Sequence, residues 1–269
     1  LRGTNQQSAT GAGLLYQPPG YVHRTVSSTG VVSEFTSREG LRLRRFELHN
    51  RSGGSASCGI GFRLQNRFWV AGQFTAAGVF TADTADAQDL GAGDFILGAD
   101  AVNDGFIIAS PVPFSWVSIN VGTAEVDNAG ADMDHAVTYS DTAGTGWTAL
   151  GANATYTDQF TTTNGVYATG ALEFVWQPPS DWGQVVSLGG IPVGYYALRA
   201  MAASTAAGDT AGLATSVEVG TLVVVEAVAD NGIWENELTT YGEHRADALV
   251  AYFSTANAGN RAYFEVKTG

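Results

Sequence analysis

The apolar residues of this chain come in short runs that alternate with polar residues, and turn-forming residues separate one run from the next. Residues 41–48 and 114–121 show this alternation most clearly, and a period of two residues is that of a strand with one buried face. The 34 glycines are spread along the chain, as is typical of many short strands joined by turns. The pattern predicts an all-β protein of the β-sandwich or jelly-roll type, with one large or two packed β domains.

Two hairpins are expected from the turn signals. The first pairs residues 41–48 with the run that ends at Leu64, across the turn at 52–55, with a bulge at Arg44 and Arg45. The second pairs the strand ending at Tyr139 with residues 147–150. Further strands are expected at residues 171–176, 195–203, 216–225, 248–253 and 261–266.

Helix is expected to be minor, because the best amphipathic stretch, residues 234–241, is short. We divide the chain into four segments. Residues 1–30 are an extended N-terminal arm, 31–110 a first β region with a long acidic loop at 71–105, 111–225 a β-sandwich module, and 226–269 a C-terminal β-hairpin region.

Charge is unevenly distributed along the chain, whose net charge is −13. Residues 1–67 carry nine arginines and three glutamates, whereas residues 68–198 carry fourteen acidic residues and neither lysine nor arginine. An acidic surface favours solubility; the polarity also fits an oriented contact in which the basic section meets an acidic protein. The overall negative charge argues against nucleic acid as the partner.

The remaining signals concern location and the single cysteine. Apolar stretches stop after about six residues, far short of a membrane span, so no membrane partner is expected. Residues 1–20 lack the features of a secretion signal, and we expect that a segment preceding Leu1 either was removed or was never included in this sequence. Cys58 lies in a strand-like run and is expected to be a buried apolar residue rather than a reactive thiol.

The sequence offers little for catalysis, and we expect no catalytic, cofactor-binding or metal-binding residues. The histidines lack the spacing of a zinc site, and no nucleophile turn, phosphate loop or dinucleotide fingerprint is present; they are His23, His49, His135 and His244. Two acidic groups, at residues 83–104 and 125–134, could supply calcium ligands, but solvated loops are favoured because the ligand spacing of a known calcium loop is absent. Tryptophans that a sugar-binding surface would use are expected in the core instead: Trp69, Trp147, Trp176, Trp182 and Trp234.

One stretch carries a family likeness. The runs Gly-Trp-Thr-Ala-Leu at 146–150, Trp-Gln-Pro-Pro-Ser-Asp-Trp at 176–182 and Gly-Tyr-Tyr-Ala-Leu-Arg-Ala at 194–200 resemble a β-sandwich module of structural proteins in tailed bacteriophages. The resemblance spans residues 147–225 and implies a virion component, on head or tail, without catalytic residues. Independently, Pro178 and Pro179 are suited to end a strand, and Trp182 to fold back into the core.

Three functions are weighed on these grounds. The first is a non-enzymatic viral structural protein, a capsid decoration or other shell-associated subunit, which binds copies of itself and other virion proteins and is located in the virion. The second is a carbohydrate-binding or receptor-binding β-sandwich module of a phage tail or a secreted protein. The third, a β-sandwich hydrolase, would need carboxylates that converge in space.

Overall fold

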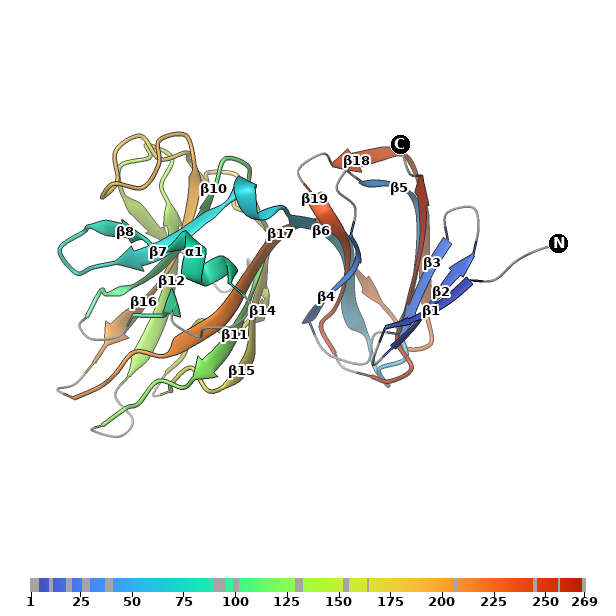
Figure 1. Ribbon diagram of the computed structural model, residues 1–269, viewed down its shortest axis with the longest axis horizontal. Helices are drawn as coiled ribbons and strands as arrows, with labels where there is room; N and C mark the ends of the chain where they lie inside the picture. Colours follow the sequence, from blue (N-terminus) through green and yellow to red (C-terminus); the bar gives the residue numbers. More distant parts are fainter. Residues whose placement is uncertain are drawn as a thin grey trace. The chain divides into compact units, whose positions relative to one another are not determined.

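The computed structural model confirms an all-β sandwich-type fold (Figure 1). It describes residues 5–9, 12–17, 21–25, 30–36, 41–89, 95–98, 102–128, 133–151, 155–163, 165–205, 208–243, 246–255 and 257–267. Helix in these ranges is limited to the 3-10 turn η1 (Asn66–Phe68) and the helix α1 (Thr84–Gln88). Neither has the length and hydropathy that a membrane span requires.

The chain forms two compact units. Unit 1 combines Leu1–Gln65 with Gly220–Gly269, and unit 2 is Asn66–Val219. These limits differ from the four segments proposed from sequence, because strands from the two ends of the chain pair with each other in unit 1. The long strand β17 (Leu213–Val228) contributes its first part to unit 2 and its second part to unit 1.

Unit 1 is a sandwich of two antiparallel sheets. One sheet has the order β1 (Asn5–Ala9), β2 (Ala12–Gln17), β3 (Tyr21–Thr25), β20 (Arg261–Lys267), β5 (Leu41–His49) and β18 (Ile233–Glu243). In the other, the second part of β17 is followed by β6 (Ala56–Leu64), β19 (Ala246–Phe253) and β4 (Gly30–Thr36). Phe46 and Phe264 from the first sheet and Phe62 and Leu249 from the second are buried in one core.

The first 30 residues contain three of these strands. The backbone of β3 pairs with β20, and the hairpin β1–β2 extends the sheet outward from β3. The backbone is thus extended, as the sequence indicated, and it continues a sheet of unit 1. The prediction that residues 1–20 bind a neighbouring molecule stays a prediction.

The first expected hairpin is wrong in its pairing, although both strands exist. β5 pairs with β18 and β20, whereas β6 pairs with β17 and β19, so residues 50–55 form an arch between two sheets. The side-chain amide of Asn50 holds the arch by donating to the carbonyls of Gly54 and Val228, each at 2.7 Å. The predicted bulge is confirmed, because Arg45 pairs with Glu265 and Leu43 with Val266, which leaves Arg44 as the extra residue.

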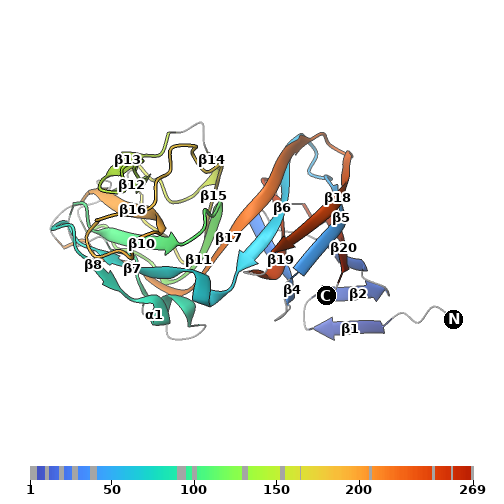
Figure 2. The ribbon, with the colours of Figure 1, turned by 90° about the horizontal axis from the view of Figure 1, so that it is seen from above.

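Unit 2 also contains two antiparallel sheets. The first has the order β13 (Trp147–Ala149), β12 (Asp134–Ser140), β16 (Tyr196–Ser204), β10 (Gly105–Ser110), β7 (Val70–Phe74) and β8 (Phe80–Ala82), and Figure 2 shows β12, β16 and β10 side by side. The second has β14 (Thr155–Asp158), β15 (Gly170–Trp176), β11 (Trp116–Thr123) and the first part of β17, which also pairs with β9 (Phe95–Ile96). The expected hairpin at residues 137–150 is confirmed as β12–β13.

One expectation about local structure is wrong. Residues 71–105, expected as a loop, contain β7, β8, α1 and β9. Small residues let these strands approach closely: a Cβ on Gly72 would lie 2.1 Å from the carbonyl oxygen of Thr81. The expectation that helix is minor is confirmed, and residues 234–241, the best helical candidate, belong to the strand β18, which pairs with β5.

The strand end at residues 176–182 behaves as the sequence predicted. β15 ends at Trp176, and Trp182 returns to the core, where its side chain is only 7% exposed. Its indole packs against Phe114, Trp176 and Tyr196, with ring centroids 5.0, 5.9 and 5.5 Å away. Its Nε1–H donates to Ser140 Oγ and to the carbonyl of Ala197.

Candidate functional site

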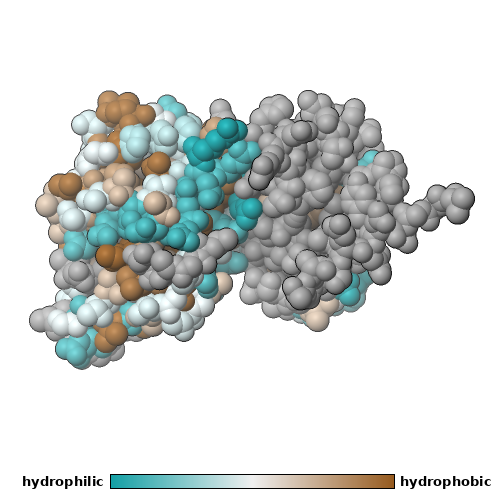
Figure 3. Space-filling view, in the orientation of Figure 1, coloured by the Kyte–Doolittle hydropathy of each residue, from teal (hydrophilic) through white to brown (hydrophobic). Residues whose placement is uncertain are grey.

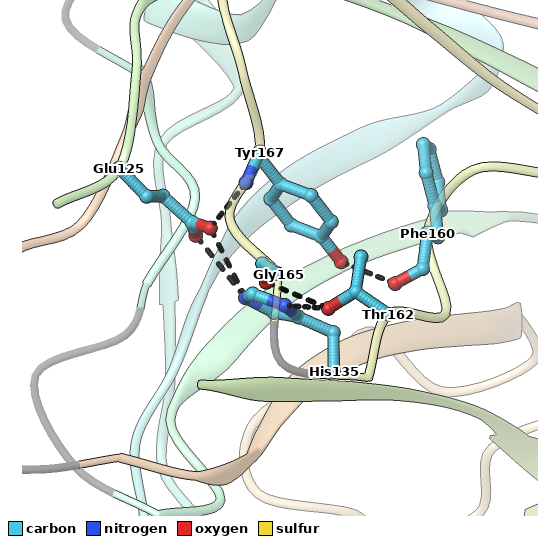
Figure 4. A network of polar contacts seen from close by, with 6 residues as sticks. All are labelled: Glu125, His135, Phe160, Thr162, Gly165 and Tyr167. Atoms are coloured by element: carbon cyan, nitrogen blue, oxygen red, sulfur yellow. Dashed lines mark hydrogen bonds and ion pairs between the residues drawn. The ribbon is translucent and has the colours of Figure 1, made fainter. Parts of the chain in front are cut away.

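The buried network of titratable side chains in unit 2 centres on His135 (Figure 4). His135 lies on β12, Glu125 follows β11, and Thr162 lies between β14 and β15. The ring nitrogen Nδ1 is 2.6 Å from Thr162 Oγ1, and Nε2 is 3.2 Å from each carboxylate oxygen of Glu125. Backbone hydrogen bonds in both directions between His135 and Thr162 fix the two segments side by side.

Tyr167 closes the network from the other side. Its backbone N–H donates to Glu125 Oε2 at 2.7 Å, and its hydroxyl donates to the carbonyl of Phe160 at 2.6 Å. Its ring stacks on His135, with centroids 4.0 Å apart and planes inclined by 24°. Burial, helped by the negative charges of Glu125 and Asp158, raises the pKa of Tyr167 well above its usual value, so the hydroxyl stays protonated and keeps this bond.

The available protons decide how the network is bonded. Thr162 has one hydroxyl proton, and its Oγ1 lies 2.9 Å from the carbonyl of Gly165, which needs a donor. If the hydroxyl donates there, Nδ1 of His135 must carry a proton and donate to Thr162 Oγ1. When Nε2 also donates to the ionised Glu125 carboxylate, every contact in Figure 4 is satisfied at once. A carboxyl group that donates to Nε2 of a neutral imidazole would satisfy the same contacts, so the network fixes a proton on Nδ1 but not the charge of the pair.

The order hydroxyl, imidazole and carboxylate is that of an acyl-transfer triad, but the geometry does not favour such chemistry. A general base must accept the proton of the nucleophile, whereas here the hydroxyl proton is directed to Gly165 and Nδ1 serves as a donor. The side chains of His135 and Glu125 are 1% and 0% exposed, so neither reaches a substrate at the surface. We interpret the network as a structural tie between three segments of unit 2.

The sequence contained these residues without linking them. His135 was one of four histidines and Glu125 part of an acidic group, and the role of Thr162 was missed because nothing in its spacing points to the other two. His49 lies 3.4 Å from Glu47 and beside the ring of Tyr263, which is a separate contact in unit 1. The side chains of His23 and His244 lie outside the described residues.

The acidic groups considered for calcium do not converge where the structure describes them. In those parts of the chain, no group of three or more histidine, cysteine or acidic side chains is placed to hold a metal ion. Glu125 is buried in the His135 network, and Asp104 accepts a hydrogen bond from the backbone of Ala76. The expectation that the whole chain lacks a metal site stays a prediction.

The tryptophans do not form an exposed platform. Trp69, Trp116, Trp176 and Trp182 are buried, while Trp147 and Trp234 are half-buried and pack against core clusters. The expectation that they serve the core is confirmed. Cys58 is likewise fully buried, and burial raises the pKa of its thiol to about 12.

Comparisons of the chain with protein-family models, with curated proteins and with solved structures give no match.

Proposed function

We propose that this protein is a non-enzymatic structural protein that acts through protein–protein assembly. The observation that carries the proposal is the kind of large apolar side chain at the surface. Among the described side chains, the large hydrophobic ones that are exposed belong to six aliphatic residues and a single aromatic residue, Tyr156. Aliphatic side chains suit a contact with another protein, whereas a sugar-binding surface uses exposed aromatic rings.

The two most exposed of these residues share one loop of unit 2. Val193 is 72% and Val186 59% exposed, and we call them the loop valines. Hydrogen bonds from Val185 N to the carbonyl of Tyr195 and from Gly194 N to the carbonyl of Val185 hold the two arms of the loop together. Figure 3 shows apolar side chains in brown over the loops that Figure 1 draws in gold. The loop valines are therefore held in place before any partner binds, which lowers the entropic cost of binding.

Two further observations support a role without catalysis. The His135 network commits its hydroxyl, imidazole and carboxylate to internal bonds, so it leaves no free base or nucleophile. The resemblance of residues 147–225 to a module of tailed-bacteriophage structural proteins supports placing the protein in a virion, as a capsid decoration or other shell-associated subunit. The alternative is a carbohydrate-binding or receptor-binding module of a phage tail or a secreted protein, which would present Tyr156 to its ligand.

Sedimentation equilibrium of the purified protein tests the assembly. We expect a self-associating species that the double variant Val186→Asp, Val193→Asp shifts towards the monomer, because each new carboxylate would be desolvated in the contact. The matched control is Val102→Asp, an exposed valine beyond the other end of β16, which should leave the association unchanged. A monomeric wild-type protein that also fails to bind particles of the encoding virus would contradict the proposal.

The alternative is tested by a glycan-binding assay with the variant Tyr156→Ala. Saturable glycan binding that this variant abolishes would favour receptor binding over assembly.

A further inference from the structure

Unit 2 buries one of its very few positive charges. Residues 66–219 contain sixteen acidic residues but only two basic ones, Arg67 and Arg199. Arg67 is exposed and lies over the ring of Phe68, whereas Arg199 is only 9% exposed. A buried charge in a folded protein is ordinarily paired, because leaving water is costly.

Two aromatic rings contact the guanidinium of Arg199. The residue lies in the middle of β16, and Trp147 and Phe74 reach it from β13 and β7, each two strands away on opposite sides. The guanidinium carbon is 4.6 Å from the ring centroid of Trp147 and 5.3 Å from that of Phe74. The rings also touch each other edge to face, with centroids 5.6 Å apart. The planar cation is therefore held in a defined orientation.

The hydrogen bonds of Arg199 are incomplete. Its Nε–H donates to Thr138 Oγ1 on the neighbouring strand at 3.1 Å. Within the described part of the chain, neither terminal nitrogen has a protein acceptor or an acidic partner, and neither is among the fully buried side-chain atoms that lack a partner. Burial lowers the pKa of Arg199 to about 10, and no carboxylate of the described residues offsets the desolvation, so the group is still charged at neutral pH.

We propose that Arg199 is the recognition group of an anion site in unit 2 and that the anion is a carboxylate. With Nε bound to Thr138, the four N–H groups of the two terminal nitrogens form the free end of the fork. A carboxylate accepts two parallel hydrogen bonds from that end, in the plane of the guanidinium.

The charge of unit 2 further favours a carboxylate over a phosphate. A carboxylate carries one negative charge and neutralises the buried guanidinium of Arg199. A phosphate at neutral pH carries more, about 1.5 to 2 negative charges, in a unit whose acidic residues outnumber its basic ones by sixteen to two. The site is independent of the loop valines and does not rest on the assembly proposed above.

The experiment titrates the full chain with sodium acetate at constant ionic strength, with chloride as the replaced anion. The readout is the Nε–Hε resonance of Arg199 in the nitrogen-15 spectrum, assigned by its loss in Arg199→Lys, together with the melting temperature. We expect a saturable shift and a rise in melting temperature with acetate, and at least a tenfold weaker response to phosphate. Arg199→Lys and Arg199→Gln should show at least a tenfold weaker acetate dependence of the melting temperature. Arg67→Gln, the matched control, should keep the acetate dependence of the wild type.

Several results would overturn the site. They are a shift that does not saturate, an equal response to phosphate, and an acetate effect on the melting temperature that persists in Arg199→Gln. Arg199→Lys keeps the charge, so it remains informative if Arg199→Gln does not fold. Sedimentation with and without acetate then separates two sources of the carboxylate: dissociation by acetate assigns it to an acidic side chain of a second copy, and unchanged association to a free small carboxylate.

Discussion

Replacing Trp182 by alanine tests the packing of unit 2 most directly. The indole is 7% exposed, packs against three aromatic rings and donates to two acceptors, Ser140 Oγ at 3.1 Å and the carbonyl of Ala197 at 3.2 Å. Removing a buried tryptophan side chain costs about 3–5 kcal/mol, through lost burial and the cavity left behind. We expect the free energy of unfolding to fall by that amount.

A second substitution separates packing from hydrogen bonding. Trp182→Phe keeps a ring in the core but removes the Nε1–H. Ser140 Oγ still receives the backbone N–H of Ala197 and donates to the carbonyl of Gly183, so the loss falls mainly on the Ala197 carbonyl. Leaving that buried acceptor without a donor costs about 1–3 kcal/mol, to which the smaller volume of phenylalanine adds.

The assay is urea unfolding followed by fluorescence and by near-ultraviolet circular dichroism. Because the chain has two compact units, the transition of unit 2 must be identified separately, and Trp234→Ala in unit 1 serves as the control for that assignment. A loss below about 1 kcal/mol for Trp182→Ala, the range of surface substitutions, would refute the assignment of Trp182 to the core.

Three other predictions concern the thiol, the His135 network and the N-terminus. Cys58 should resist thiol reagents until the protein unfolds. Because burial raises the pKa of its thiol from 9.0 to about 12, the stability that the buried thiol contributes is complete below pH 9 and declines by about 1.4 kcal/mol per pH unit above pH 9. Cys58→Ala should not show this decline. Glu125→Gln should lower the free energy of unfolding by about 3–5 kcal/mol and Thr162→Val by about 1–3 kcal/mol in urea titrations, because each leaves buried partners unpaired; losses near zero would show that the network is not formed. Deleting residues 1–20, which removes β1 and β2, should leave the melting temperature nearly unchanged and weaken self-association in sedimentation experiments; full association with a collapsed melting temperature would show that these residues are core strands.

Local sequence patterns determined the strands of this protein but not all of their pairings. The alternation at residues 41–48 predicted β5 and even the bulge at Arg44, because side-chain direction and phase are local properties of a strand. The turn at residues 140–146 also specified the hairpin β12–β13, since a tight turn fixes its own register. Residues 50–55 have the composition of a hairpin turn but form an arch between two sheets. The arch depends on the hydrogen bond from the side-chain amide of Asn50 to the carbonyl of Val228, a contact that the local sequence does not reveal.

The same distinction holds for the candidate sites. Burial of Cys58 and Trp182 followed from their place in apolar runs, a signal contained in the neighbouring residues. Glu125, His135 and Thr162 meet because three segments are packed together, and no spacing rule links positions that far apart. Arg199 is the last residue of a Tyr-Tyr-Ala-Leu-Arg run, and this run does not indicate which aromatic rings contact the guanidinium. Phe74 and Trp147 reach it only because the strand order of the sheet places β7 and β13 on either side of β16, and that order is a long-range property that tertiary structure alone decides.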